Sequence, residues 1–293
     1  MVKYLIIGSS GYVGAAVAKD LRFAYNVGLS KNSLKYSCSF KTNIILDRNK
    51  IVDQIHKFEP EVVINSAWNS VGDYSEDVAM SNIEDQIKLF EFVRSLSKVK
   101  KVINFGSAWE CPNFGSCPES EGKSDTPFLK AKKVVRDKYF EFFNNRHYWL
   151  RLFYVYGLEP KKGLVKYIAD TINAKKDVRL NYPESSVDYI NILDVVNAIH
   201  AFSTQHINGG VYNIGSGIAT SNIAILEKVL NTLMPDDKNK IKDILNLQGE
   251  KSSEHFWADT EKSSELVWNK ECRNILEDIP EIVRSILNKK KLP

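Results

Sequence analysis

The sequence has few cysteines, and neither they nor the histidines are spaced as metal ligands. Four cysteines occur in 293 residues without paired spacing, and the five histidines form no cluster. In a reducing compartment, cysteines scattered in this way are most simply interpreted as thiols at small core or surface positions. We therefore expect no metal site, and we interpret four residues as ordinary thiols: Cys38, Cys111, Cys117 and Cys272.

The chain also lacks a long hydrophobic run and an excess of either charge. No apolar segment approaches the roughly 20 residues of a membrane span, and Met1–Lys3 leads into a strand pattern rather than a signal peptide. Forty Lys and Arg against 36 Asp and Glu give a net charge of +4. Nucleic acid and membrane are therefore not the expected partners, and we expect a cytoplasmic protein. With 43% hydrophobic and 26% charged residues, the composition is that of a soluble α/β enzyme.

A glycine-rich turn lies between an apolar segment, Tyr4–Ile7, and a helical pattern that continues from Ala15. Gly8 permits a tight turn, Gly11 lets backbone N–H groups approach a pyrophosphate, and Gly14 lets the helix pack on the strand. The alternative is an ordinary glycine loop, but the strand before it and the helix after it favour a dinucleotide site. The cofactor-binding residues predicted here are Gly8, Ser10, Gly11, Tyr12, Val13 and Gly14.

Short apolar strands alternate with helical patterns through the middle of the chain, which predicts a Rossmann-type, doubly wound parallel sheet of the α/β class. We expect strands near residues 3–7, 25–29, 62–65, 102–105 and 148–153, and helices near 48–58, 78–97 and 128–144. The pattern changes after residue 157. We therefore expect a dinucleotide-binding domain of residues 1–157, rejoined by about 188–212. A smaller C-terminal α+β substrate domain should comprise 158–187 and 213–293 and end in an amphipathic helix near 275–289.

Segments of this chain, in their order and spacing, resemble the extended short-chain dehydrogenase/reductase family. They are Gly8–Gly14, Pro60–Ala67 followed by Asn82, Phe105–Ala108, Phe128–Lys132, Arg151–Gly157, Asp188–Val196 and Tyr212–Gly217. The resemblance is to the branch of NAD(P)-dependent epimerases and dehydratases that act on nucleoside-diphosphate sugars, and it spans nearly the whole chain. It implies the fold, whereas fold alone does not fix function.

The resemblance also implies catalytic positions. In this family a tyrosine exchanges a proton with a sugar oxygen, a lysine four residues later holds the nicotinamide ribose, and a Ser or Thr bonds the same sugar oxygen. Ser107 and Lys132 match this pattern. The tyrosine position is Phe128, whose ring has no hydroxyl and can neither give nor take a proton. Further cofactor contacts implied by the resemblance are Ser66, Ala67, Asn82 and Lys132.

Three interpretations of Phe128 remain open. A misalignment is disfavoured, because the next tyrosine, Tyr139, is followed four residues later by Phe143 rather than by lysine. Alternatively the protein has lost or rerouted the proton step, as a cofactor-bound sensor or scaffold, or as an enzyme that uses water or a substrate hydroxyl. The third interpretation is a laboratory replacement of Tyr by Phe that gives an inactive form. Ser107 and Lys132, both retained, favour this third interpretation over a long-idle site.

The nicotinamide form should be selected at the end of the second strand, where an acidic residue would bind the adenosine ribose hydroxyls. This chain has Ser30 and Lys31 there, a hydroxyl and a cation that suit a 2′-phosphate. We therefore expect NADP rather than NAD, and an NADP preference favours net reduction of a keto-sugar. The alternative is that Ser30 and Lys31 are only a polar exit from the strand.

Substrate-side signals are fewer. Trp109 follows Ser107 closely enough to line the same site, and Tyr154 and Lys166 are further candidates for binding the sugar nucleotide, with Ser107. An indole in the core and a solvated lysine are the alternatives. Arginines that commonly hold the diphosphate are absent, with Val187 and His255 near their places.

These observations predict an NADP-dependent keto-reductase of a nucleoside-diphosphate sugar, in deoxysugar or surface-polysaccharide biosynthesis. The alternatives are an NAD-dependent 4-epimerase or dehydratase and a catalytically silent sensor or scaffold of the same fold. Apolar residues at helical spacing in 78–97 and 128–144 also predict pairing of two copies as a homodimer. The residues that carry this prediction are Phe90, Phe92, Val93, Val134, Val135, Tyr139, Phe140 and Phe143.

Overall fold

The computed structural model divides the chain into two compact units. Unit 1 comprises Met1–Pro112, Glu119–Leu152 and Val195–Asn213, and unit 2 comprises Asn113–Pro118, Phe153–Asp194 and Ile214–Pro293. The residues that the structure describes are 2–20, 25–29, 39–40, 52–111, 115–119, 125–144, 147–158, 160, 162–248, 255–263, 266 and 272–289. Among the described residues, no helix combines the length and the apolar character needed to span a bilayer.

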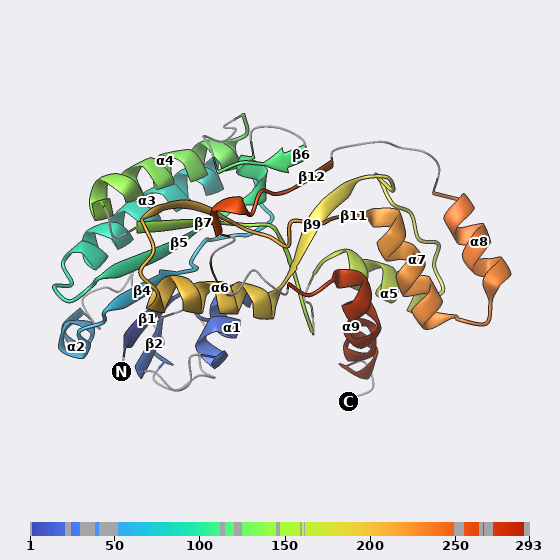
Figure 1. Cartoon of the computed structure of the whole chain (residues 1–293), viewed down its shortest axis with the longest axis horizontal. Helices are drawn as coiled ribbons and strands as arrows, with labels where there is room; N and C mark the ends of the chain where they lie inside the picture. Colours follow the sequence, from blue (N-terminus) through green and yellow to red (C-terminus); the bar gives the residue numbers. More distant parts are fainter. Residues whose placement is uncertain are drawn as a thin grey trace. The chain divides into compact units, whose positions relative to one another are not determined.

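A seven-stranded sheet with the order β10-β7-β5-β4-β1-β2-β3 is the centre of unit 1 (Figure 1). Its strands are β1 (Lys3–Ile7), β2 (Tyr25–Leu29), β3 (Ser39–Phe40), β4 (Val62–Asn65), β5 (Lys101–Ser107), β7 (His147–Leu152) and β10 (Gly210–Ile214). Neighbouring strands from β3 to β7 run parallel. Strands β1, β4 and β5 are buried, nearly continuous apolar runs, as a sheet covered on both faces requires.

Helices cover the two faces of this sheet. Figure 1 shows α3 (Glu76–Arg94) and α4 (Pro127–Phe143) side by side on one face, and α1 (Tyr12–Asp20) and α6 (Ile192–Thr204) on the other. The short α2 (Val52–Phe58) contributes Ile55 to the same core as α3 and α4. The doubly wound parallel sheet predicted from the alternating pattern is confirmed.

Unit 2 contains a second sheet with the order β11-β9-β12-β6, in which β8 also pairs with β9. Its strands are β6 (Gly115–Cys117), β8 (Tyr154–Tyr156), β9 (Ser186–Asn191), β11 (Ala219–Ser221) and β12 (His255–Ala258). The helices α5 (Leu164–Asn173), α7 (Asn222–Leu233), α8 (Lys238–Asn246) and α9 (Ile275–Lys289) share one apolar core. Short 3₁₀ helices are η2 (Ala108–Glu110) in unit 1 and η4 (Glu261–Ser263) in unit 2.

One sequence-based interpretation is wrong at this level, whereas the homodimer stays a prediction. Cys111 and Cys117 are disulfide-bonded, so the interpretation of both as thiols is wrong, whereas Cys272 is a free thiol and Cys38 lies outside the described residues. Most of the residues behind the dimer prediction are buried in the core of unit 1, because α3 and α4 turn their aromatic stripes toward the sheet. These are Phe90, Phe92, Val93, Val135, Tyr139 and Phe143, whereas Val134 is exposed and Phe140 is partly buried.

Candidate functional site

The carboxyl ends of β1, β4 and β5 lie at one edge of the unit 1 sheet. Ile7 is opposite Asn65, and Asn65 is opposite Asn104, so the three strands end next to one another. Open parallel α/β sheets bind their ligands at this edge, since the loops after the strands meet there. The glycine turn follows β1, Ser66 and Ala67 follow β4, and Ser107 is the last residue of β5.

The glycine turn is packed so tightly that two of its positions exclude a side chain. Gly8 has a φ of 82°, and a Cβ there would lie 2.7 Å from the backbone nitrogen of Ala67. A Cβ on Gly14 would lie 2.4 Å from both the Gly8 oxygen and the Ser66 hydroxyl. Gly11 donates its N–H to the Gly8 carbonyl at 2.9 Å, and its own Cβ position is more open, 3.2 Å from that oxygen. The strand, turn and helix therefore pack this closely only because Gly8 and Gly14 have no side chain.

Two hydroxyls at this turn are buried without a hydrogen-bond partner. They belong to Ser9 and Tyr12, and burial also raises the pKa of Tyr12 above its usual value. Buried polar atoms are normally satisfied, so unsatisfied ones at a helix N-terminus mark a place where a polar ligand fits. Ser10 is exposed and Val13 is partly buried in the same turn. The turn therefore fits the pyrophosphate of a dinucleotide.

A buried amide network supports the loop that follows β4. Asn65 donates from Nδ2 to Gln86 at 2.7 Å and to Asn104 at 3.0 Å, and Gln86 donates to the Ala67 carbonyl at 2.8 Å. The Ser66 hydroxyl donates to the Ile7 carbonyl at 2.8 Å. These contacts join the ends of three strands to α3, which fixes the backbone beside the glycine turn.

Asn82, predicted as a cofactor contact, uses its amide on the protein backbone. Its Oδ1 accepts from the N–H of Asn69 at 2.8 Å, and its Nδ2 donates to the carbonyls of Asn69 at 3.2 Å and Val78 at 2.8 Å. Asn69 also donates from its side chain to Asp85 at 2.6 Å. Asn82 and Asp85 therefore hold the loop after β4 onto α3.

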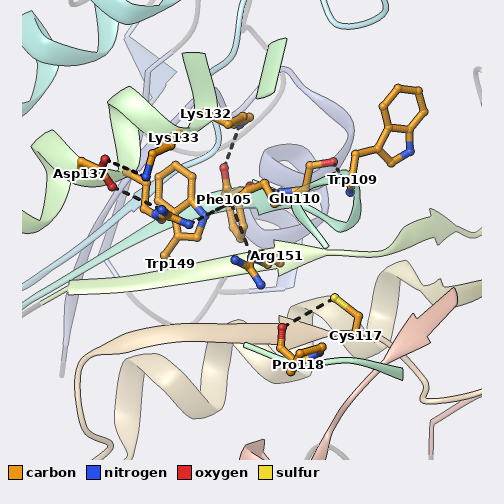
Figure 2. Close-up of polar contacts among 12 residues, drawn as sticks. Phe105, Trp109, Glu110, Cys117, Pro118, Lys132, Lys133, Asp137, Trp149 and Arg151 are labelled. Atoms are coloured by element: carbon orange, nitrogen blue, oxygen red, sulfur yellow. Dashed lines mark hydrogen bonds and ion pairs between the residues drawn. The ribbon is translucent and has the colours of Figure 1, made fainter. Parts of the chain in front are cut away.

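Ser107 begins η2 with a reciprocal capping arrangement. Its hydroxyl accepts from the N–H of Trp109 at 3.2 Å, and its own N–H donates to the carboxylate of Glu110 at 2.7 Å. The Glu110 carboxylate is buried and also accepts from Trp149 Nε1 at 3.0 Å. Figure 2 shows the Trp109 indole turned away from this buried cluster. Glu110 thus orients the end of β5, where Ser107 lies.

Two arginines lie against the same carboxylate. Arg151 Nε lies 3.6 Å from Glu110 Oε2 (Figure 2). Arg136 Nη1 lies 3.9 Å from the same oxygen. Both guanidinium groups are buried. Burial lowers the pKa of Arg151, and the charge of Glu110 acts in the opposite direction. Glu110 is therefore a carboxylate shared by two buried guanidinium groups, and Asp137 Oδ1 also lies 3.4 Å from Nη2 of Arg136.

Lys132 extends from α4 toward the end of β5. Its ammonium donates to the Phe105 carbonyl at 2.9 Å, as Figure 2 shows, and lies 3.6 Å from the centroid of the Trp68 ring. Burial lowers the pKa of Lys132 to about 8, and the charge of Glu110 opposes this shift. The ring of Phe128, one helical turn earlier, has its centroid 5.8 Å from the ammonium.

Phe128 lies among other aromatic rings. Its ring centroid is 5.8 Å from that of Trp68 and 5.4 Å from that of Tyr74, both with edge-to-face geometry. Tyr74 also stacks on Trp109, with centroids 5.5 Å apart and planes 30° apart. We call Trp68, Tyr74, Trp109 and Phe128 the aromatic cluster. Its members come from the loop after β4, from η2 and from the start of α4.

The remaining predicted residues lie elsewhere. Tyr154 in β8 packs on Tyr189 and Phe256, with centroids 5.7 and 6.1 Å away. Lys166 on α5 pairs with Asp170 at 2.7 Å, an ordinary helical ion pair. Both belong to unit 2. Ser30 and Lys31 lie outside the described residues, and no group of potential metal ligands occurs in the part of the chain that is described.

The sequence analysis missed Trp68, Tyr74 and Glu110. Trp68 directly follows the carboxyl end of β4, and this position in an open α/β sheet is itself a signal for a ligand site. Tyr74 precedes the N-cap of α3, Ser75, and nothing local distinguishes it from a surface residue. Glu110 stands three residues after Ser107, the spacing of a capping box, and this pattern could have been recognised.

Comparison with known proteins identifies a matching family and a set of similar folds. Residues 4–215 match the NAD dependent epimerase/dehydratase family. The sequence has no match among curated proteins. Three similar solved structures share its fold over nearly their whole lengths, at sequence identities too low to carry more than the fold.

The first is the UDP-glucose 4-epimerase of Thermotoga maritima with UDP-glucose, with 17% identity, a TM-score of 0.81, and coverage of 99% of this chain and 100% of that one. The second is the dTDP-glucose 4,6-dehydratase of Bacillus anthracis in complex with NAD, with 16% identity, a TM-score of 0.78, and coverage of 100% and 98%. The third is a Tyr-to-Phe mutant of the UDP-glucuronic acid 4-epimerase of Bacillus cereus. It was solved with NAD and a fluorinated deoxy analogue of UDP-glucuronic acid, and it has 16% identity, a TM-score of 0.79, and coverage of 98% and 100%.

Proposed function

The chain belongs to the NAD dependent epimerase/dehydratase family, and we propose that it is a nicotinamide-dependent enzyme that acts on a nucleoside-diphosphate sugar. The family match covers the glycine turn, Ser107, Phe128 and Lys132. The solved relatives with full-length likeness include complexes with UDP-sugars and with NAD. These likenesses support the substrate class and the cofactor class.

The buried ammonium of Lys132 is the observation that carries the proposal. A lysine is almost never fully buried unless it is paired, because removal of its charge from water costs several kcal/mol. Lys132 has a carbonyl and an aromatic ring as neighbours, and no carboxylate forms an ion pair with it among the described residues. An apolar side chain at position 132 would stabilise the fold more than the buried lysine does. A strongly shifted titratable group at a ligand-binding sheet edge is typical of a functional site.

Each residue has a specific role in this proposal. The turn of Gly8, Gly11 and Gly14 holds the pyrophosphate by its backbone N–H groups and by the N-terminus of α1. Lys132 binds ribose hydroxyls of the cofactor, and Ser107 donates a hydrogen bond to the reacting oxygen of the sugar. When bound, the nicotinamide supplies or accepts the hydride. Glu110 keeps Ser107 in place through the Ser107 N–H.

Within the family, we favour an NAD-dependent epimerase or dehydratase over the keto-reductase that the sequence alone suggested. The similar structures include 4-epimerases and a 4,6-dehydratase, several of them in complex with NAD. The residues that favour NADP are Ser30 and Lys31. The keto-reductase, with NADP, is the second candidate.

Reduction of bound nicotinamide by a nucleotide sugar tests the proposal. The purified protein, loaded with NAD⁺ or NADP⁺, is mixed in turn with UDP-glucose, UDP-glucuronic acid and dTDP-glucose. We expect the near-ultraviolet absorbance of reduced nicotinamide with at least one of them. The same measurement on Phe128→Tyr separates a chain that lacks the proton step from a protein outside this chemistry. Cofactor binding, followed by calorimetry, without reduction in either protein would favour the silent sensor or scaffold.

A further inference from the structure

The position of Phe128 leaves the proposed reaction without a proton donor beside Lys132. Tyr139, on the same helix, cannot fill this role, because its hydroxyl donates to the Val102 carbonyl at 2.5 Å and accepts from the Tyr148 N–H at 3.0 Å. Tyr139 is also fully buried. A side chain in contact with the Phe128 ring is therefore a candidate donor, beside water and a substrate hydroxyl.

Tyr74 brings a phenol into contact with that ring. Its ring centroid is 5.4 Å from that of Phe128, with edge-to-face geometry, and 5.5 Å from that of Trp109, with stacked geometry. The side chain is partly open to solvent, with 48% of the residue exposed. In the described part of the chain no hydrogen bond engages its hydroxyl. Tyr74 therefore combines a held ring with a hydroxyl that is available to a ligand.

The loop that carries Tyr74 has a defined and partly strained backbone. Ser70 has a φ of 53°, and Gly72 a φ of 100°. The Asp73 N–H donates to the Ser70 carbonyl at 2.9 Å, and the Ser75 N–H donates to the Asp73 carboxylate at 3.0 Å. A non-glycine residue at positive φ persists where its surroundings over-determine it, and such residues cluster at functional sites.

We propose that Tyr74 is the acid/base residue of the reaction and supplies the hydroxyl that Phe128 lacks. The inference rests on the proposed function. It assigns the proton step to the loop after β4 rather than to α4. In this proposal the Phe128 ring is a packing surface for the phenol of Tyr74. Trp109 stacks on the same phenol, so both neighbours of Tyr74 are positioning residues.

The atoms balance in either direction of the reaction. In sugar oxidation, the carbinol C–H bond would break and a bound nicotinamide would accept its hydride, while the sugar hydroxyl proton passes to the Tyr74 oxygen and the phenol's own proton passes to water. The sugar carbon would become a carbonyl, and the dinucleotide would be reduced. In reduction, the carbonyl carbon accepts the hydride and its oxygen takes the proton from the Tyr74 hydroxyl. Water then returns a proton to the phenolate.

Relocation of the hydroxyl tests this proposal. Four proteins are compared in the nicotinamide reduction assay: wild type, Tyr74→Phe, Phe128→Tyr and the double variant. Tyr74→Phe keeps both ring contacts and removes only the oxygen. We expect it to lose about two to four orders of magnitude in rate with cofactor affinity unchanged, and we expect the double variant to recover to the rate of Phe128→Tyr. Tyr182→Phe, which removes an exposed phenol from unit 2, is the matched control and should keep the wild-type rate.

Two results would overturn the proposal for Tyr74 and leave the proposed function intact. Tyr74→Phe could keep the wild-type rate, or the wild type could be inert while Phe128→Tyr is active, and in either case Tyr74 does not supply the proton. If all four proteins bind the cofactor and none reduces it, the proposed function fails and this inference fails with it. A structural role for Tyr74 would not be rescued by a hydroxyl on Phe128, so recovery in the double variant distinguishes the two roles.

Discussion

The ammonium of Lys132 lies 3.6 Å from the centre of the Trp68 ring, and its hydrogen bond goes to the Phe105 carbonyl. A cation over an indole face is attracted by the ring quadrupole, by about 2 kcal/mol or more when desolvated. This attraction offsets part of the cost of the buried charge. It also means that a ligand that binds Lys132 must share the ammonium with the ring.

The depressed pKa of Lys132 predicts a specific dependence of stability on pH. Its pKa is about 8 in the folded protein against 10.5 for an ordinary lysine. Between these values the unfolded chain binds the extra proton, so the free energy of unfolding rises with pH, by up to about 1.4 kcal/mol per unit. Below pH 8 both states are protonated and this contribution is constant. Lys132→Met should lose the rise.

Urea unfolding of wild type and Lys132→Met at several pH values measures this difference, and other titrating groups cancel in the comparison. We expect the two stabilities to converge as the pH rises from about 8 toward 10. If the free energies of unfolding of the two proteins instead differ by the same amount at every pH in this window, Lys132 keeps an ordinary pKa in the folded protein.

Glu110→Gln should destabilise unit 1 strongly. The substitution removes the negative charge beside Arg136 and Arg151. In either orientation of the new amide, its N–H group faces another donor, Trp149 Nε1 or the Ser107 N–H. The loss of one partner from a buried charge cluster costs roughly 3–5 kcal/mol. Glu141→Gln is the control, because its ion pair with Lys138 is exposed, and such pairs contribute at most about 1 kcal/mol. Equal effects of the two substitutions on urea unfolding would contradict the assigned role of Glu110.

Two glycine substitutions should separate folding from cofactor binding. Gly14→Ala places a Cβ 2.4 Å from the Gly8 oxygen, so we expect it to destabilise the fold by about 1–3 kcal/mol or more. Gly11→Ala meets that oxygen only at 3.2 Å, so the fold should survive. Its methyl group lies where the pyrophosphate must approach, and cofactor affinity should fall by about tenfold or more. Thermal unfolding and calorimetry report the two effects. If Gly11→Ala binds the cofactor with unchanged affinity, the cofactor does not bind at this turn.

Lys31→Asp should change the preference between the two nicotinamide forms. An aspartate repels the 2′-phosphate of NADP and can accept from the ribose hydroxyls of NAD. The ratio of NADP affinity to NAD affinity should therefore fall by about tenfold or more, which is about 1.4 kcal/mol. Calorimetric titration of both proteins with both cofactors measures the ratio. A ratio that does not change would place Lys31 away from the adenosine ribose.

Hydrophobic patterns in the sequence predicted the bounds of those strands and helices that end at turn residues. The strands Lys3–Ile7, Tyr25–Leu29 and Val62–Asn65 and the helix Ile275–Lys289 have the bounds expected from the sequence. Each is a short apolar run or a strong helical stripe limited by turn residues. The helix expected at 78–97 instead covers Glu76–Arg94, with Ser75 at the N-cap position and Ser95, whose N–H donates to the Phe92 carbonyl, at the C-cap position.

The candidate site was predictable only where it follows a motif. The glycine turn, Ser107 and Lys132 have fixed spacing, whereas the contact of Tyr74 with Phe128 joins residues that the fold brings together over 54 positions of sequence. Glu110 reads as a solvated charge in the sequence, and its burial depends on β7 and α4. The disulfide state of Cys111 and Cys117 was missed because the expected reducing compartment suggested thiols.

The edge strand β10 has a consequence for how the protein is made. It pairs with β7 but is encoded at Gly210–Ile214, after α5, β8, β9 and α6. During synthesis, β7 therefore emerges from the ribosome well before its outer neighbour exists. Until then its N–H and C=O groups form an open sheet edge, which is a template for association with other chains. A nascent chain stalled after β7 should be prone to aggregation. Once residues up to 214 have emerged from the ribosome, β10 can pair with β7 and aggregation should decrease.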